Sequence, residues 1–156
     1  MNLSLRPVTE KDVNEFSGTE SYGGMSDKER LCMIQDSIRG ICRDKYYKLL
    51  AAVDGSDVVG FVSLCGHSAH NVSIGLDIRQ EYRNRGYGTA ALRLALDFVR
   101  REGFTVASAT MRENNAASQA LNPKLGFEEL TGYVNDRGIR IKVFVKNLLD
   151  RGIIDS

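Results

Sequence analysis

The chain has 156 residues, 42% of them hydrophobic and 26% charged, which suits one globular domain with a buried core. We therefore expect a single domain over residues 1–156. The 21 basic and 20 acidic side chains leave a formal net charge of +1, so neither nucleic acid nor an anionic membrane is expected as a partner. No apolar run approaches the roughly 18 residues that span a bilayer, and the N-terminus lacks the apolar core of a signal peptide, which predicts a cytoplasmic location.

The first part of the chain predicts a short strand followed by two helices. Residues 3–8 are typical of a strand ended by a proline. Thr9, with Asp12 three residues later, resembles a helix start. Ser26 with Glu29 is a clearer capping box. After it, four apolar residues recur at helical spacing and predict a helix face packed on a sheet; they are Leu31, Ile34, Ile38 and Ile41.

Three apolar runs then predict a meander of antiparallel strands. Residues 49–53 and 58–64 are joined by Asp54-Gly55-Ser56-Asp57, which is a hairpin turn signal. The third run, residues 72–78, alternates apolar with small or polar side chains. One face of that strand is therefore expected to carry Val72, Ile74, Leu76 and Ile78.

The second half of the chain alternates helices and strands. Residues 81–89 form a loop rich in glycine and arginine, residues 90–102 predict a strong helix, and Gly103 supplies its stop. A strand, a short helix and two strands around a turn follow at residues 105–111, 114–121, 128–134 and 139–145. This order predicts a mixed α/β (α+β) fold with a twisted, mostly antiparallel central sheet of six to seven strands and about four flanking helices.

The segment Arg83-Asn84-Arg85-Gly86-Tyr87-Gly88-Thr89-Ala90 lies between an expected strand and an expected helix. Free N–H groups and the positive end of the dipole make such a junction an anion site. The glycines allow close approach, and the arginines add forked donors. A P-loop is excluded because GxxxxGK[ST] is missing, and the dinucleotide fingerprint lacks its third glycine. The alternative is a tight turn with solvated arginines.

The cysteines and histidines predict no metal site. Cys32, Cys42 and Cys65 are three in number and have no CxxC spacing, so neither a disulfide framework nor a zinc site follows. We interpret them as ordinary buried or half-buried thiols. His67 and His70 flank a predicted hairpin loop, and two histidines alone do not make a metal site.

The segment from Ile78 to Leu92 resembles the acetyl-CoA signature of the GNAT N-acetyltransferase superfamily: Arg or Gln, two residues, Gly, one residue, then Gly or Ala. A second family block follows in Asn115-Ala116-Ala117-Ser118 and Lys124-Leu125-Gly126-Phe127. The opening Leu5-Arg6-Pro7-Val8-Thr9-Glu10-Lys11-Asp12 is also similar to many members. The resemblance covers residues 3–147.

The resemblance implies a splay between the fourth and fifth strands, residues 72–78 and 105–111, where the pantetheine arm of acetyl-CoA lies. The backbone of residues 85–89 would cradle the pyrophosphate, and the N–H of Ile78 would face the thioester carbonyl, where an amide can stabilise an oxyanion. The implied cofactor residues are Leu76, Ile78, Arg83, Arg85, Gly86, Tyr87, Gly88, Thr89, Asn115 and Asn122.

Both usual proton carriers of the family are replaced in this chain. Asn122 stands where many members have a tyrosine acid, and an amide cannot deliver a proton. Thr110 stands where some members have a glutamate base. The candidates for the base are Asp77, Glu113 and His67. The candidates for the acid are Tyr133 and Tyr87. The alternatives are a solvent-facing strand residue for Asp77, a solvated loop charge for Glu113, an exposed loop residue for His67 and a cover of the sheet edge for Tyr133.

The resemblance implies an acetyl-CoA-dependent N-acetyltransferase that acts by direct attack of an amine, from a small molecule or a peptide, in a ternary complex. Cys65 as an acyl carrier, a longer acyl chain and an alcohol acceptor remain alternatives. The main rival is a coenzyme A-binding sensor or scaffold without activity, and a further rival is an interaction protein with a vestigial loop. The acceptor site is expected at residues 18–25 and 133–140, with a mobile loop at residues 21–24. A homodimer through the late strands is expected by family analogy.

Overall fold

The structure is a computed structural model, and it describes residues 1–112 and 124–149 of the chain. Its strands are β1 (Leu3–Pro7), β2 (Ile41–Cys42), β3 (Lys45–Asp54), β4 (Asp57–Gly66), β5 (Asn71–Ile78), β6 (Val106–Arg112), β7 (Glu128–Val134) and β8 (Arg140–Asn147). Its α-helices are α1 (Asp27–Arg39) and α2 (Tyr87–Arg101), and its 3-10 helices are η1 (Glu10–Phe16) and η2 (Gln80–Tyr82). The helix predicted at residues 114–121 lies outside the described residues.

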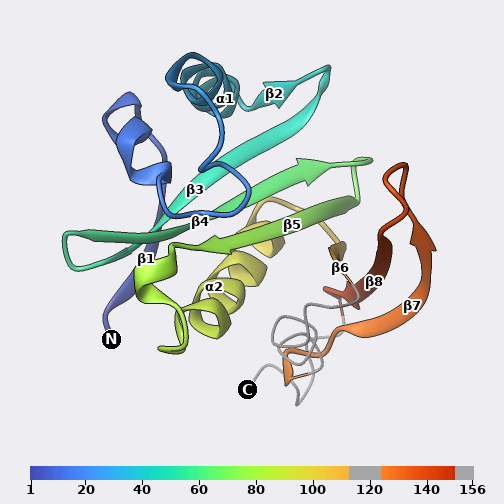
Figure 1. Cartoon of the computed structure of the whole chain (residues 1–156). Coiled ribbons are helices and arrows are strands. Elements are labelled where there is room, and N and C mark those ends of the chain that lie inside the picture. Colours follow the sequence, from blue (N-terminus) through green and yellow to red (C-terminus); the bar gives the residue numbers. More distant parts are fainter. Residues whose placement is uncertain (113–123, 150–156) are drawn as a thin grey trace.

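The strands form one sheet in the order β1-β3-β4-β5-β6-β8-β7, with the short β2 paired to β3 (Figure 1). Every neighbouring pair in this order is antiparallel except β5 and β6, which are parallel. A parallel pair needs a crossover, and α2 supplies it. The predicted mixed fold with a mostly antiparallel sheet is therefore confirmed. The two-residue β2 was not expected, and neither was η2, which lies where a loop was predicted.

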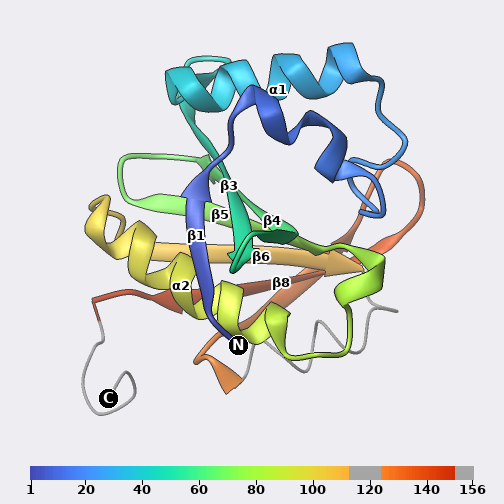
Figure 2. The same cartoon turned by 90° about the vertical axis from the view of Figure 1, so that its left-hand side faces the viewer.

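The sheet has one helical layer on each face (Figure 2). Alternate residues of a strand point to opposite faces, so the sheet divides the buried apolar side chains into two cores. The core under α2 includes Val62, Leu64 and Val72, and the core under η1 and α1 includes Phe16 and Phe61. Residues of β5 that follow Val72 at even spacing therefore face α2, and those between them face η1 and α1.

Helix α1 begins as predicted and ends earlier than predicted. Ser26 Oγ accepts the N–H of Glu29 at 3.2 Å, and the Glu29 carboxylate accepts the N–H of Ser26 at 3.1 Å, which completes the capping box. Gly40 ends the helix with φ of +77°. The predicted apolar stripe is wrong in its second half. Ile38 is 62% exposed, and Ile41 lies beyond the helix, in β2, and is 54% exposed.

The parallel strands β5 and β6 separate after a short contact, which confirms the predicted splay. They pair at three positions, of which Ser73 opposite Ser108 is the last. Both strands continue beyond this point, β5 to Ile78 and β6 to Arg112. The two strands therefore diverge toward the carboxyl end of β5, where the glycine-rich loop begins.

Candidate functional site

Hydrogen bonds at both ends of β5 show which of its residues are bonded to β4. At one end, the N–H of Arg79 donates to the carbonyl of Val59 at 2.8 Å. At the other, the N–H of His67 donates to the carbonyl of Asn71 at 2.8 Å. Antiparallel strands alternate between residues that exchange hydrogen bonds and residues that do not. Counted from Asn71, every second residue of β5 is therefore bonded to β4, and the residues between them direct their backbone to the opposite edge.

Leu76 and Ile78 belong to the second group, so their N–H groups point into the splay. The carbonyl of Ile78 accepts from Nε of Arg83 at 3.0 Å, which agrees with this outward direction. Since the pairing with β6 ends at Ser73, the edge of β5 beyond that residue has no strand partner among residues 1–112 and 124–149, and it can pair with another chain-like molecule. An amide N–H at such an edge can also stabilise an oxyanion.

The loop before α2 presents unpaired backbone donors. Asn84 has φ of +64° and Gly86, which caps the helix, has φ of +86°. The first helical bond runs from the N–H of Ala90 to the carbonyl of Gly86 at 3.3 Å. Within residues 1–112 and 124–149, no group accepts the N–H groups of residues 85–89. These donors and the positive end of the helix form an anion site of the kind that holds phosphate.

The two arginines of the loop point in different directions. Arg83 turns back to β5: its guanidinium lies 3.5 Å from the Glu20 carboxylate and 3.9 Å from that of Asp77. Arg85 lies over the ring of Tyr82, 5.8 Å from its centre. Arg83 therefore joins the loop to the strand, and Arg85 remains beside the unpaired N–H groups.

Tyr87 takes a position that fits the cofactor loop and not an acid. Its hydroxyl donates to Asp54 at 2.5 Å, and this hydrogen bond raises the pKa of Tyr87. The phenol is therefore directed to the turn between β3 and β4, and its acidity is reduced.

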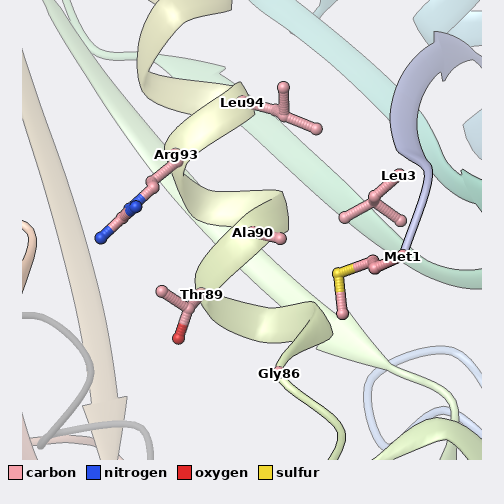
Figure 3. A pocket seen from close by; sticks show the side chains of 7 residues that line it. All are labelled: Met1, Leu3, Gly86, Thr89, Ala90, Arg93 and Leu94. Carbon is pink, nitrogen blue, oxygen red and sulfur yellow. The ribbon is translucent and has the colours of Figure 1, made fainter.

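A pocket of about 420 Å³ adjoins the anion site along the first two turns of α2. Figure 3 shows Thr89 and Arg93 projecting from one side of the helix, while Met1 and Leu3 of the first strand approach its other side. Gly86 lies at the start of the pocket. The pocket therefore offers a cation and apolar contacts next to the phosphate-type site. Arg93 was not among the predicted residues, because nothing in its sequence context separates it from a solvated helix arginine.

Asp77 faces η1 and α1 and is only 8% exposed, so the alternative of a solvent-facing strand residue is wrong. One of its oxygens accepts the N–H of Ser21 at 2.6 Å, and the other lies 3.3 Å from the N–H of Glu20. The carboxylate thus binds the segment that was expected to be a mobile loop. Arg30 adds to this, because its guanidinium donates to the carbonyls of Tyr22 and Gly23 at 3.3 and 3.0 Å.

The remaining candidates lie in different parts of the molecule. His67 is exposed, and its Nε2 is hydrogen-bonded to Ser73 Oγ. Cys32 and Cys65 are exposed and Cys42 is half-buried, so the expected burial is wrong for Cys32 and Cys65. Partial desolvation still raises the pKa of the Cys65 thiol, which disfavours the thiolate that an acyl carrier needs. Tyr133 is 52% exposed on β7, three strands from β5 in the sheet order. The structure therefore does not bring Tyr133 beside Asp77 by strand pairing. Outside the described residues lie Glu113, Asn115 and Asn122.

Two absences apply to the part of the chain that the structure describes. None of its helices has the length and apolar character needed to cross a membrane. No three His, Cys, Asp or Glu side chains of residues 1–112 and 124–149 are grouped in a way that could hold a metal ion.

A strand edge without a strand partner in the described residues, followed by a helix start with unpaired N–H groups, suits a nucleotide-linked, chain-like cofactor. The model of the Acetyltransferase (GNAT) domain matches residues 2–128. The chain therefore belongs to the GNAT acetyltransferase family. This confirms the predictions of the family, of an acyltransferase and of acetyl-CoA as cosubstrate.

Solved structures with the same fold include three acetyltransferases. A spermidine N-acetyltransferase from Vibrio cholerae, in complex with CoA and spermine, has 16% identity and a TM-score of 0.79, with 95% of this chain and 96% of that chain covered. A ribosomal-protein-alanine N-acetyltransferase from Brucella melitensis has 21% identity and a TM-score of 0.77, with 92% and 99% covered. An N-acetyltransferase from Staphylococcus aureus Mu50 has 15% identity and a TM-score of 0.76, with 95% and 99% covered. No curated protein sequence matches the chain significantly.

Proposed function

We propose that this protein transfers the acetyl group of acetyl-CoA to an amine of a small molecule or a peptide, by direct attack in a ternary complex. The observation that carries the proposal is the continuity of the free β5 edge, at Leu76 and Ile78, with the unpaired N–H groups of residues 85–89. A pantetheine arm carries amides that can pair with a strand edge, and the pyrophosphate that follows it suits the helix start. Two of the proteins of similar fold are named as N-acetyltransferases of spermidine and of a ribosomal protein, which supports an amine acceptor.

Each proposed cofactor residue has a distinct task. The backbone of residues 85–89, including Tyr87, Gly88 and Thr89, binds the pyrophosphate. Arg85 supplies a nearby cation, while Arg83 fixes the loop to the carbonyl of Ile78. The N–H of Ile78 faces the thioester carbonyl. Asn115 and Asn122 remain proposed partners of the pantetheine arm.

The residues that transfer protons are a separate part of the proposal. An alkylamine with a pKa of about 10 must lose a proton before it attacks. Glu113 as base and Tyr133 as acid stay proposals. Each oxygen of Asp77 already accepts a backbone N–H group, which leaves less of the carboxylate available to an amine. We therefore assign to Asp77 first the task of holding the acceptor segment.

A second candidate function is a coenzyme A-binding sensor or scaffold of the same fold. Asn122 in place of the family tyrosine favours it, because an amide cannot protonate the leaving thiolate. A coenzyme A thiol, with a pKa of about 8.5, leaves without a strong acid. General acid–base help is worth about 10² to 10⁴ in rate, so the missing tyrosine predicts a slower enzyme and does not require an inactive one.

A homodimer through the late strands is also proposed. The edge strand β7 exposes Leu130, Tyr133 and Val134, and an apolar edge strand favours pairing with another chain. Sedimentation equilibrium tests this, and a monomer at 100 μM would contradict it. A cytoplasmic location stays a prediction from the sequence.

The test of the main proposal is calorimetric titration with acetyl-CoA, followed by thiol release with a panel of amines. Gly86→Glu adds a side chain where φ is +86° and a carboxylate where the phosphates bind, so we expect affinity to fall at least about 100-fold. Gly103→Glu is the matched control, because Gly103 also has a positive φ, of +97°, but lies beyond the opposite end of α2 in open space. If neither variant changes the affinity for acetyl-CoA, the proposed pyrophosphate site at residues 85–89 is contradicted. Binding without thiol release, with any amine, favours the sensor.

A further inference from the structure

The pocket along the first turns of α2 continues from the proposed pyrophosphate site and has two different walls. On one side, Thr89 and Arg93 project from the helix (Figure 3). On the other side, Met1 and Leu3 approach it. A methyl group added at Gly86, which caps the helix, would lie 3.7 Å from Cε of Met1. The pocket therefore begins at the unpaired N–H groups, and a ligand bound there can extend along the helix.

Arg93 is placed to reach a group that lies some way along the helix from its start. Arg93 is seven residues beyond Gly86, which is about 10 Å along the helix axis. Side chains of a helix tilt toward its N-terminus, and residues four apart lie one above the other. The side chain of Arg93 therefore leans toward the turn of Thr89, on the same side of the helix (Figure 3). A ribose that follows a phosphate at the helix start comes within reach of this guanidinium.

The charge of Arg93 is not neutralised within the described chain. On the same helix, Arg100 pairs with Asp97 at 3.3 Å, whereas no acidic side chain among residues 1–112 and 124–149 pairs with Arg93. None of the described residues that line the pocket is acidic. A guanidinium is always charged, and its forked donors match the oxygens of a phosphate. The pocket therefore favours a second anionic group in addition to the pyrophosphate.

Coenzyme A carries such a group, because its adenosine has a phosphate at the 3′ position. A phosphate monoester has a charge of about −1.5 to −2 at pH 7. We propose that the pocket binds the adenosine end of coenzyme A, with Arg93 on the 3′-phosphate and with Met1 and Leu3 against the purine ring. The protein would then select coenzyme A over its 3′-dephospho form. The pocket volume of about 420 Å³ lies within the range of roughly 300–1,000 Å³ for small-molecule sites. This inference rests on the proposed acetyl transfer from acetyl-CoA.

The test is calorimetric titration with coenzyme A and with 3′-dephospho-coenzyme A. We expect the wild type to bind coenzyme A about 10-fold more tightly, as for one hydrogen-bonded charge pair. Arg93→Gln should raise the Kd of coenzyme A about 10-fold and leave that of the dephospho form within twofold. Arg101→Gln is the matched control, because it removes the same charge from an exposed position in the last turn of the same helix. It should leave both Kd values within about twofold.

Ala90→Leu tests the place of the adenosine separately from the phosphate. Ala90 lines the pocket between its two walls (Figure 3), and leucine, a good helix former, would fill this space. We expect the Kd of both ligands to rise by the same factor, so that the preference for coenzyme A is kept. The melting temperature of each variant shows that it is folded.

Several outcomes would overturn the proposal. An Arg93→Gln variant that binds coenzyme A as the wild type does removes Arg93 from the site. The same follows if Arg93→Gln weakens both ligands equally, or if Arg101→Gln does equal damage. A wild type that does not distinguish the two ligands contradicts recognition of the 3′-phosphate, and an Ala90→Leu variant with unchanged affinities contradicts adenosine binding in the pocket. Wild-type protein that binds neither ligand overturns the acetyl-transfer function itself, and this outcome is distinct from equal binding of both.

Discussion

Two loops meet at the carboxyl end of β5, and they use their backbone N–H groups in opposite ways. The cofactor loop, residues 83–89, leaves the N–H groups of residues 85–89 without a partner in the described chain. The acceptor loop, residues 18–25, gives the N–H groups of Glu20 and Ser21 to Asp77. The same chemical group is therefore left for the proposed ligand in one loop and holds the fold in the other.

The difference follows from what each loop lies against. The cofactor loop opens a long helix, whose first N–H groups have no partner within the helix and whose dipole favours an anion. The acceptor loop lies against the buried carboxylate of Asp77 and the guanidinium of Arg30, which together bind two of its N–H groups and two of its carbonyls. An anionic ligand is thus attracted to the first loop, while charges within the chain fix the second.

The two loops are also joined to each other. The N–H of Gln80 donates to the carbonyl of Gly18 at 2.9 Å, and Arg83 stands between Glu20 and Asp77. A displacement of the end of β5 should therefore affect both halves of the site, whereas a change inside one loop should affect that half first. Three substitutions test this comparison.

Gly60→Ala should have the largest effect, because it displaces the strand that both loops share. An added methyl group would lie 2.6 Å from the carbonyl oxygen of Asp77 and 2.9 Å from Cα of Ile78, so the backbone of β5 must shift. A misplacement of about 1 Å can lower the rate about 100-fold, and we expect kcat to fall by about 10- to 100-fold. Steady-state kinetics with acetyl-CoA and an accepted amine measure this.

Gly40→Ala is the control for simple loss of stability. Gly40 has φ of +77° at the end of α1 and lies in open space, so alanine there strains the chain without touching β5. We expect a lower melting temperature and an unchanged kcat at 25 °C. If Gly60→Ala also leaves kcat unchanged, the placement of Ile78 does not control the reaction.

Asp77→Asn should separate the two halves of the site. The amide keeps one acceptor but turns an NH2 group toward a backbone N–H, so the acceptor loop loses a charged hydrogen bond worth about 1.5–3 kcal/mol. We expect KM for the amine to rise about 10-fold and the melting temperature to fall by several degrees. The Kd of acetyl-CoA should stay within threefold.

A base at Asp77 would give a different result. Loss of a general base lowers kcat by about 10² to 10⁴ and needs no change in melting temperature. Asp97→Asn is the matched control, because Asp97 is an exposed residue of α2 that pairs only with Arg100 in the described bonds. A large loss of kcat at unchanged stability would restore Asp77 as the base and contradict the role assigned here.

The cofactor half could be predicted from the sequence because its determinants are local. Gly86 and Gly88, a neighbouring arginine and a helix start lie within a few residues, so their pattern is visible along the chain. The antiparallel meander follows from the alternation of apolar residues, and the splay follows from the family resemblance. The left-handed conformation of Asn84 was not anticipated, since asparagine adopts it only at some sites.

The acceptor half could not be predicted, because its contacts join residues far apart. Asp77 binds the N–H of Ser21 across 56 residues, and Phe61 of β4 packs against the ring of Tyr22. The sequence Ser21-Tyr22-Gly23-Gly24 has the composition of a loop, and nothing in it indicates that a buried carboxylate will hold it. The prediction of the apolar face on α1 was wrong for a related reason. Residue spacing alone does not tell how much of a helix the sheet covers, and Ile38 stays exposed.

Asp12→Asn should have the smallest effect and bear on the acceptor side alone. Asp12, in η1 before the acceptor loop, is buried and accepts from Arg6 at 2.8 Å and from the N–H of Thr9 at 2.8 Å. Burial by itself would raise its pKa, but these hydrogen bonds outweigh burial and lower the pKa of Asp12 below its ordinary value. Its ionised form is therefore stabilised in the folded protein. The cofactor loop, residues 83–89, has no acidic residue and therefore no carboxylate that could act as Asp12 does.

The sign of the pH dependence follows from this lowered pKa. A carboxyl group with a folded pKa below its unfolded value of about 3.9 contributes stability above that pH, and the contribution is lost as the pH falls through the folded pKa. Asp12→Asn should lower the free energy of unfolding at pH 7 by about 1–3 kcal/mol and flatten its decline between about pH 5 and pH 2. Urea unfolding at several pH values measures both, with the exposed Glu10→Gln as a control expected within about 0.5 kcal/mol. Parallel pH curves for the wild type and Asp12→Asn would contradict the assignment, because another carboxylate would then carry the acid sensitivity.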